Sequence, residues 1–276
     1  GLDGKDRVII LTVHLYPVRY LQSENTIFYT KAADVKVTYE KGAQPLQAES
    51  EYDLVIITPT RFLPGVIPLM KHKNQHGVST KIVTTQSIYL KYKGRDKQED
   101  IKLFIKDAIE QWNITYVLLV GGRQGFGVRW AVPARYSNLE DKGGWNETYV
   151  SDLYYSDIYK YNNGTMEFDD WDSNGNGVFA EWKWTWNGLY WTWPITSQDI
   201  LDLYPDVYLG RLACRDLSEV SIVVRKIINY ENNAYNQSWF KNMIAVGGDT
   251  VPYGDGVAEG EFENNYSAVI MESIGF

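Results

Sequence analysis

The fold of this 276-residue chain is decided by the stretch Asp53-Leu54-Val55-Ile56-Ile57-Thr58-Pro59. Its apolar centre, Leu54 to Ile57, is typical of a short strand that is buried on both faces of a sheet. From this point the hydrophobic pattern alternates between strands and helices. Such alternation predicts an α/β fold with a mostly parallel sheet and right-handed crossover helices.

The helix that follows the second predicted strand has the clearest pattern in the chain. Asp96 and Glu99 form a capping box in front of it, and its apolar residues share one face. The first helix has Pro64 in its first turn and Gly77 as its terminator. In chain order, the predicted elements are a helix at Leu63–Gln75, a strand at Lys81–Val83, a helix at Lys97–Trp112 and a strand at Tyr116–Val120.

The α/β pattern resumes near the C-terminal end. Val207–Leu209 predicts a strand, and Asp216 with Glu219 at its third position predicts the start of a helix. We expect a further strand at Met243–Val246 and a helix from about Val257 almost to Phe276.

Two regions depart from this pattern. Residues 1–48 form a segment in front of the α/β part, where alternation at Val8–Leu15 and Val35–Tyr39 predicts two or three strands. Residues 123–203 form a long insertion rich in Trp, Tyr and Asp. In the insertion, alternating tryptophans flank Asn187-Gly188, which predicts a hairpin with a two-residue type I′ turn. The indole row, Trp182, Trp184, Trp186, Trp191 and Trp193, either binds a sugar or packs onto the domain, and packing is favoured because exposed indole rows are costly.

A calcium motif lies within the insertion, in Asp170-Trp171-Asp172-Ser173-Asn174-Gly175-Asn176-Gly177-Val178-Phe179-Ala180-Glu181, which fits D-x-[DN]-x-[DN]-G-x5-E throughout. We expect one calcium ion to be held by side-chain oxygens of Asp170, Asp172 and Asn174, the carbonyl of Asn176 and both oxygens of Glu181. The flanking segments do not resemble EF-hand helices, so the ion is expected to be structural. A polar Asp/Asn/Gly turn without metal is the alternative.

Composition excludes several partners. The net charge of −8 and the sequence pI of about 5.0 argue against nucleic acid or an anionic membrane as the main partner. No stretch is long enough to span a membrane, and if the protein is exported its leader has been removed. One cysteine excludes an internal disulfide framework. Sequons at Asn113, Asn146, Asn163, Asn236 and Asn265 favour a secreted, glycosylated protein.

No catalytic pair can be assembled from the sequence. Cys214 follows a strand near Arg211, which could lower the pKa of the thiol, yet free cysteines are also commonly buried. None of the three histidines, His14, His72 and His76, ends a predicted parallel strand. Asp152 and Asp157 admit a glycosidase pair, a second cation site or a solvated loop. The glycines after Tyr116–Val120 have neither dinucleotide nor P-loop spacing.

Several segments together resemble the gingipain-type cysteine endopeptidases. The similar segments, in order, are Tyr16–Tyr20, Tyr52–Pro59, Pro68–Lys73 with Gly77, Tyr116–Gly122, Val132–Tyr136, Ser151–Tyr155 and Tyr204–Leu212. The resemblance implies a caspase-like α/β architecture of two subdomains. Residues 51–237 then correspond to the first subdomain and residues 240–276 to the start of the second.

The resemblance also implies which subdomain carries the catalytic residues. In this family the catalytic His and Cys belong to the second subdomain, and no residue of this chain matches either position. The family holds structural calcium as well, in agreement with the motif. We therefore expect a calcium-stabilised, non-catalytic part of a secreted or cell-surface peptidase, whose partners are the rest of the peptidase and a peptide or protein substrate. The alternative is an extracellular glycan- or protein-binding module that uses the Trp-rich hairpin.

Overall fold

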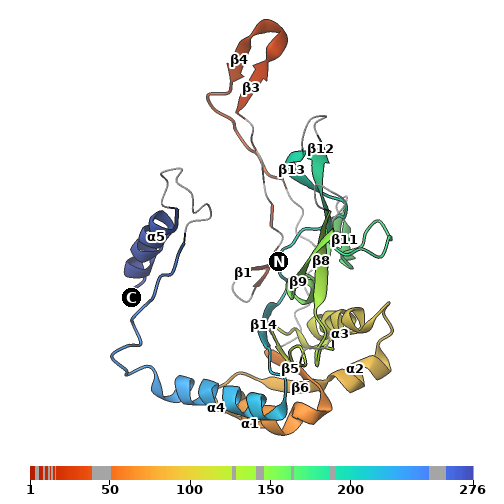
Figure 1. Cartoon of the computed structure of the whole chain (residues 1–276), viewed down its shortest axis with the longest axis vertical. Coiled ribbons are helices and arrows are strands. Elements are labelled where there is room, and N and C mark those ends of the chain that lie inside the picture. The colour runs from red at the N-terminus through yellow and green to blue at the C-terminus, as the bar shows by residue number, and fades with distance from the viewer. Residues whose placement is uncertain are drawn as a thin grey trace. The chain divides into compact units, whose positions relative to one another are not determined.

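A four-stranded parallel sheet is the centre of the fold in the computed structural model (Figure 1). The structure describes the chain except for residues 4–5, 9, 12, 14, 16, 39–50, 126–128, 141–145, 163–164, 187–190, 249–258 and 276. The strands are β5 (Leu54–Thr58), β6 (Thr80–Thr84), β7 (Tyr116–Val120) and β14 (Tyr208–Leu212). Their order is β14-β7-β5-β6, and all three pairings are parallel. The α/β prediction is confirmed.

Strand β5 is the buried central strand that its sequence predicts. All of its residues are buried, and it pairs with β6 on one side and with β7 on the other. Val55 and Ile57 belong to the main core cluster, which also contains Ile101 and Phe104 of α3. Because side chains alternate along a strand, Leu54 and Ile56 face the opposite side of the sheet.

Helices cover both faces of this sheet. They are α1 (Leu63–Gln75), α2 (Thr85–Lys91), α3 (Lys97–Trp112) and α4 (Leu217–Asn233), with a short 3-10 turn, η2 (Thr60–Phe62), before α1. Figure 1 shows α1 beside α4 on one side of the sheet and α3 on the other. At the contact of α1 with α4, a Cβ built on Gly65 would lie 2.8 Å from Val220 Cγ1, so glycine permits this close approach.

The starts of α3 and α4 follow one scheme, which corrects the predicted capping box. Asp96 accepts a hydrogen bond from the Glu99 N–H at 2.9 Å, and Asp216 accepts one from the Glu219 N–H at 2.9 Å. In each case the glutamate carboxylate accepts the backbone N–H of the arginine before the capping aspartate, Arg95 or Arg215, instead of the N–H of that aspartate. The same carboxylate also accepts a hydrogen bond from the side chain of this arginine.

The order of the parallel strands creates a topological switch point. The chain runs from β5 outward to β6, crosses back over β5 to β7, and continues outward to β14. The connections that leave β5 and β7 thus run in opposite directions. In open α/β sheets, the crevice at the carboxyl ends of two such strands is where ligands bind.

The insertion contains a second sheet that the sequence reasoning missed. Its order is β13-β12-β8-β9, with β12 parallel to β8 and the other two pairings antiparallel. A separate hairpin pairs β10 with β11. The elements are β8 (Arg135–Glu140), β9 (Asn146–Ser151), the 3-10 turn η3 (Leu153–Tyr155), β10 (Tyr159–Asn162), β11 (Thr165–Phe168), β12 (Glu181–Trp186) and β13 (Trp191–Ser197).

The predicted tryptophan hairpin exists as β12 and β13, but its register differs from the prediction. Trp186 pairs with Trp191, whereas a two-residue turn at Asn187-Gly188 would pair it with residue 189; the turn itself lies outside the described residues. The register also shifts between Trp184, which pairs with Ile195, and Thr185, which pairs with Thr192. Pro194, which has no N–H to donate, lies in the resulting bulge.

The segment before the α/β part is β-structured, although not where alternation predicts. Its strands are β1 (Leu2–Asp3), β2 (Asp6–Arg7), β3 (Val18–Leu21) and β4 (Thr26–Tyr29), with a 3-10 turn, η1 (Gln22–Glu24), between the last two. The described residues of Val8–Leu15 and of 31–38 form no strand, so those two predictions are wrong. Alternation gives a strand only where a neighbouring strand accepts its backbone hydrogen bonds.

The chain divides into two compact units, Gly1–Ile222 and Val223–Phe276. The second unit contains the end of α4 and helix α5 (Glu259–Ser273), which confirms the predicted C-terminal helix. Met243–Val246 is irregular, so the strand predicted there is wrong. The division into 1–48, 51–237 and 240–276 stays a prediction. Among the described residues, no helix is both long enough and apolar enough to cross a membrane.

Candidate metal centre

The loop with the calcium motif is anchored in the core by Trp171. This side chain is only 2% exposed and belongs to the same cluster as the residues of α3. Its indole Nε1 donates a 2.8 Å hydrogen bond to Asp157, and its φ of 66° is in the left-handed region. The buried indole fixes the start of the loop against the domain. Asp172 is buried next to it, and residues 173–177 are exposed.

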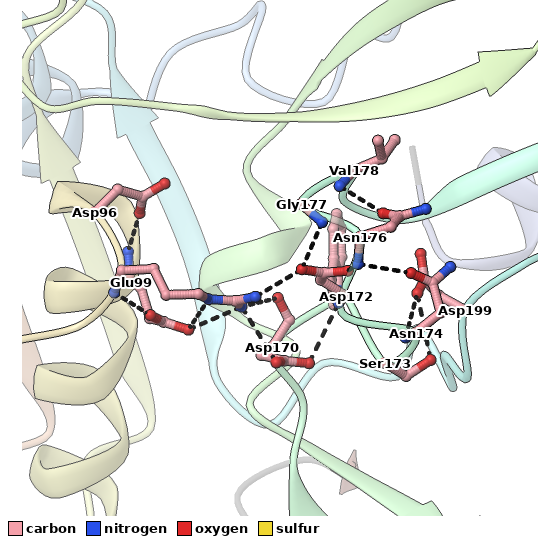
Figure 2. Close-up of polar contacts among 12 residues, drawn as sticks. Asp96, Glu99, Asp170, Asp172, Ser173, Asn174, Asn176, Gly177, Val178 and Asp199 are labelled. Carbon is pink, nitrogen blue, oxygen red and sulfur yellow. Dashed lines mark hydrogen bonds and ion pairs between the residues drawn. The ribbon is translucent and has the colours of Figure 1, made fainter.

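Asp172 is the residue about which the loop is folded (Figure 2). Its carboxylate accepts backbone N–H groups from Asn176 at 2.9 Å and from Gly177 at 3.1 Å. The Asn174 side-chain oxygen accepts the Asn176 N–H at 3.0 Å, and the Asn176 side-chain oxygen accepts the Val178 N–H at 2.7 Å. These bonds draw three side-chain oxygens toward one turn of chain.

The organisation of the loop therefore starts two residues later than the motif predicts. The residues 172–177 also fit D-x-[DN]-x-[DN]-G, and Gly177 has the positive φ, 81°, that a sharp turn requires. Gly175, the predicted turn glycine, also has a positive φ of 72°. Only the start at Asp170 satisfies the whole motif, because a start at Asp172 would place Lys183 at the twelfth position instead of a glutamate. The backbone hydrogen bonds of the loop nevertheless gather on Asp172.

Asp170, the first predicted ligand, is turned toward Arg95. Its carboxylate lies 3.2 Å from Arg95 Nη2 and accepts the Asp172 N–H at 3.2 Å. The same guanidinium lies 2.7 Å from Asp172 and 2.9 Å from Glu99 (Figure 2). Arg95 thus places a positive charge among three carboxylates, at the side of the loop that faces α3.

Glu181 and Asp199 close the other side of the loop. Glu181 accepts a 2.8 Å hydrogen bond from the Asn176 amide and lies 3.3 Å from Lys183. Burial raises the pKa of Glu181, but these two partners outweigh it, so the net pKa is lower than usual. Asp199 accepts the Glu181 N–H at 2.9 Å and the Ser173 hydroxyl at 3.3 Å. The calcium motif did not identify Asp199, because Asp199 lies outside the motif and follows β13 in the sequence.

The donor set fits a hard cation such as calcium, which prefers carboxylate, amide and carbonyl oxygens. All five predicted ligands, Asp170, Asp172, Asn174, Asn176 and Glu181, lie in one loop, and two of them contribute amides. Among the described residues, no group of three or more His, Cys, Asp or Glu side chains could hold a metal ion. A site in this loop therefore depends on the asparagine oxygens, and on a cation displacing the guanidinium from Asp172.

A buried charged cluster lies behind the loop. Lys102 is fully buried, its ammonium lies 4.2 Å from the centre of the Tyr154 ring, and it makes no hydrogen bond. Burial lowers the pKa of Lys102 to about 8, against the opposing effect of Asp169 and Asp157. Burial likewise raises the pKa of Asp157 to about 8, although Lys102 opposes it. Lys160 lies 3.4 Å from Asp169 and completes the cluster.

Cys214 lacks the surroundings of a nucleophile. It is buried, and desolvation, followed by Glu219 and Asp216, raises the pKa of its thiol. Arg211, the cation expected to lower that pKa, instead binds Asp152 with two hydrogen bonds of 2.6 and 2.7 Å. His72 is buried in α1 and His76 ends that helix, while His14 lies outside the described residues.

The Asp152 and Asp157 pair does not form a glycosidase site. Asp152 is held by Arg211, and Asp157 is fully buried under Trp171. The segment between them contains the 3-10 turn η3. General acid and base catalysis requires both groups to reach a substrate, and a buried Asp157 cannot.

The tryptophan hairpin shows partial packing. Trp182 is half-buried and lines a shallow, mainly apolar groove of about 310 Å³ with five residues of β8, β9 and β13. The side chains of Trp186, Trp191 and Trp193 lie outside the described part of the structure. Binding by the complete indole row therefore stays a prediction.

The sequence model of peptidase family C25 matches residues 47–274, which is most of the chain. The chain belongs to peptidase family C25. This membership confirms the resemblance to the gingipain-like cysteine peptidases, and the parallel sheet with helices on both faces fits a caspase-like fold. No curated protein sequence matches the chain.

Three solved structures are similar to this C25 chain. Dimeric latent PorU from Porphyromonas gingivalis has 16% identity and a TM-score of 0.45, with 72% of this chain and 17% of that chain covered. The complex of Porphyromonas gingivalis RgpB pro- and mature domains has 19% identity and a TM-score of 0.47, with 81% and 40% covered. The Arg specific cysteine proteinase gingipain R has 18% identity and a TM-score of 0.46, with 85% and 41% covered. The chain thus spans less than half the length of each.

Proposed function

We propose that this chain is a non-catalytic part of a secreted, gingipain-like cysteine endopeptidase. Residues 51–237 form the first caspase-like subdomain, and its partner is a second subdomain that contributes the catalytic His and Cys and binds a peptide or protein substrate. Membership of family C25 across residues 47–274 is the observation that carries this proposal. The state of the only cysteine supports it, since burial and two nearby carboxylates disfavour the thiolate at position 214.

The test is a peptidase assay on the isolated chain. Fluorogenic peptides with basic, acidic and apolar residues before the scissile bond are incubated with wild type and with Cys214→Ser, alongside titration of the reactive thiol. We expect no turnover from either protein, slow thiol labelling of folded wild type, and no labelling of Cys214→Ser, which has no thiol. Turnover by wild type that Cys214→Ser abolishes would contradict the proposal.

We propose further that the loop 170–181 holds one structural calcium ion through oxygens of Asp170, Asp172, Asn174, Asn176 and Glu181. The hydrogen bonds around Asp172 support this proposal, because they resemble the internal bonding of a pre-formed cation loop. A bound ion would strengthen the link between the second sheet and the core.

Thermal unfolding with calcium and with chelator tests the calcium proposal. Calcium at a hundred times its dissociation constant should stabilise the chain by about 2.7 kcal/mol. Asp172→Asn should abolish that stabilisation, whereas Asp170→Asn, which alters the residue turned toward Arg95, should only reduce it. Equal melting temperatures of wild type in calcium and in chelator would refute the proposal.

Secretion belongs to the same proposal. Of the sequons, Asn236 and Asn265 are exposed, whereas Asn113 is half-buried at the end of α3 with a φ of 51°. Glycan is therefore expected at Asn236 or Asn265 and not at Asn113 when the chain is expressed through a glycosylating secretory pathway. Intact-mass measurement before and after enzymatic deglycosylation checks this expectation.

A further inference from the structure

A pocket of about 650 Å³ opens at the carboxyl edge of the parallel sheet. Pro59 and Arg61 line it from the connection after β5, and Gln124, Arg129 and Trp130 line it from the connection after β7. These are the two connections that diverge at the topological switch point of the sheet. Thr85 and Tyr89 of α2 and Lys97 and Gln98 of α3 complete most of the wall. Its volume is in the range of small-ligand sites.

The charge of the pocket is opposite to that of the chain. Arg61, Lys97 and Arg129 line it, and none of the described Asp or Glu residues does, although the chain as a whole carries −8. Among the described residues, none of these three cations has an ion pair with a carboxylate. The acidic residues at the start of α3 are engaged elsewhere: Asp96 binds Arg135, Glu99 binds Arg95, and Asp100 accepts the Gly94 N–H at 2.7 Å. Three uncompensated cations around one pocket favour an anionic ligand.

Several backbone N–H groups around the pocket are bonded within the domain. Phosphate sites at such edges use free backbone N–H groups and the N-terminus of a helix. Here Pro59 has no N–H, and the Thr60 N–H is bonded to the Gln86 side chain at 2.9 Å. After β7, the Gly121 and Gly122 N–H groups bond the carbonyls of Leu212 and Cys214. The Thr60, Gly121 and Gly122 N–H groups are therefore not available to a ligand, whereas Lys97 and Gln98 bring the first turn of α3 to the wall. Among the lining side chains, an arginine fork matches a carboxylate.

Other wall residues suit a peptide. Gln98 and Gln124 present amides, and each donates one bond to a carbonyl of the domain, at 3.3 and 3.2 Å. An amide can donate and accept, as recognition of peptide backbone requires. Tyr89 and Trp130 provide aromatic surface for the apolar parts of a side chain. The wall thus combines cationic, amide and aromatic groups without an acidic one.

We propose that this pocket binds an acidic peptide segment, with Arg61, Lys97 and Arg129 recognising its carboxylates. The pocket is built from residues of the first unit alone. Binding therefore does not depend on the chain hydrolysing peptides, nor on the proposed calcium site.

The experiment is a calorimetric titration of the whole chain with a blocked tetraglutamate peptide, its tetraglutamine counterpart and pyrophosphate. We expect the glutamate peptide to bind, the glutamine peptide to bind on the order of tenfold more weakly or not at all, and affinity to fall with added salt. Arg61→Gln and Arg129→Gln should each weaken the glutamate peptide about tenfold. Lys71→Gln, which removes an exposed cation of α1 that does not line the pocket, should leave its affinity unchanged.

Three outcomes would overturn the proposal. The first is that the glutamate and glutamine peptides bind equally well, or that neither of them binds. The second is binding of pyrophosphate without the glutamate peptide, which would reassign the pocket to a phosphorylated ligand. The third is an equal loss of affinity in Lys71→Gln and Arg129→Gln, which would show attraction by overall charge. Circular dichroism of each variant confirms that the exposed substitutions leave the fold intact.

Discussion

Arg95 Nη1 lies 2.7 Å from Oδ2 of Asp172, and this ion pair joins the turn before α3 to the loop of the insertion. The guanidinium also lies 3.2 Å from Asp170 and 2.9 Å from Glu99. It therefore neutralises the carboxylates that a calcium ion would otherwise bring together. Arg95 and a cation compete for Asp172, because the carboxylate oxygen cannot serve both at full strength.

Arg95→Gln should consequently have opposite effects on stability and on calcium binding. In chelator, the loss of the guanidinium leaves three carboxylates close together, and we expect a destabilisation of about 1–2 kcal/mol, limited because Arg95 is 40% exposed. In calcium, the affinity should rise because the competitor is gone. Urea unfolding in both conditions and calorimetry with calcium measure the two effects.

The control is Arg215→Gln. Arg215 occupies the same place before α4 and binds Glu219 in the same way, but no aspartate of the loop. It should leave both the unfolding free energy and the calcium affinity close to those of wild type, because this pair is exposed. An identical response from the two variants would show that only the helix start matters.

Arg211→Lys should destabilise the chain although it keeps the charge. The Arg211 guanidinium binds both oxygens of Asp152 and donates to the carbonyls of Gly121, Val132 and Pro133. A lysine cannot reproduce this fork, and we expect a loss of about 1–3 kcal/mol in urea unfolding. Arg225→Lys on the exposed part of α4 is the control. A loss in Arg211→Lys no larger than in that control would contradict the role assigned to the fork.

Gly122→Ala should be strongly destabilising because of backbone contact. A Cβ at this position would lie 2.3 Å from the Ala213 carbonyl oxygen, where β7 and β14 are joined by the Gly122 N–H and the Cys214 carbonyl. We expect a loss of about 1–3 kcal/mol in thermal unfolding, as for other overpacked sites. Gly210→Ala in β14, whose nearest neighbour would be 3.8 Å away, is the matched control. Comparable melting temperatures for the two variants would disprove the contact argument.

The stability of the chain should fall as the pH rises from about 4 to about 8, in part because of Asp157. Burial raises the pKa of Asp157 from 3.8 to about 8, so the folded state keeps a proton that the unfolded chain has released. The stabilisation is complete below the unfolded pKa and is lost as the pH approaches the folded pKa. Lys102, whose pKa is lowered to about 8, stays charged in both states through most of this range.

Asp157→Asn should flatten this dependence, measured by urea unfolding in chelator at several pH values. The asparagine oxygen can still accept the Trp171 hydrogen bond, so the core anchor is retained. Burial also raises the pKa of Asp169, so part of the slope should persist. Asp34→Asn, an exposed substitution, is expected to leave the slope as in wild type. An unchanged slope in Asp157→Asn would refute the assignment.

Elements whose pattern is local could be predicted from the sequence. The buried run at Leu54–Ile57 identified the central strand, and the apolar stripe and Asp96 identified α3, because both signals depend on residues close together in the chain. The alternation at Val8–Leu15 was equally clear but formed no strand in its described residues. A strand needs a neighbouring strand for its backbone hydrogen bonds, and the sequence of one strand does not indicate which segment will pair with it.

The calcium loop shows the same division. The motif located the loop and its start at Asp170, but it did not indicate that the backbone hydrogen bonds of the loop gather on Asp172. The burial of Trp171 and the approach of Arg95 fix that arrangement. Both contacts involve α3 or the core, far from the loop in sequence, and neither has a local signature.

By itself, the sequence determined the class of the fold, the family and the position of the polar loop, since periodicity, turn residues and motif spacing act over a few residues. Only the tertiary structure decided that the insertion builds a second sheet, that Arg95 occupies Asp172, and that three cations surround the switch point between β5 and β7. These features arise from strand order and from contacts between distant segments, which depend on how the chain closes its core.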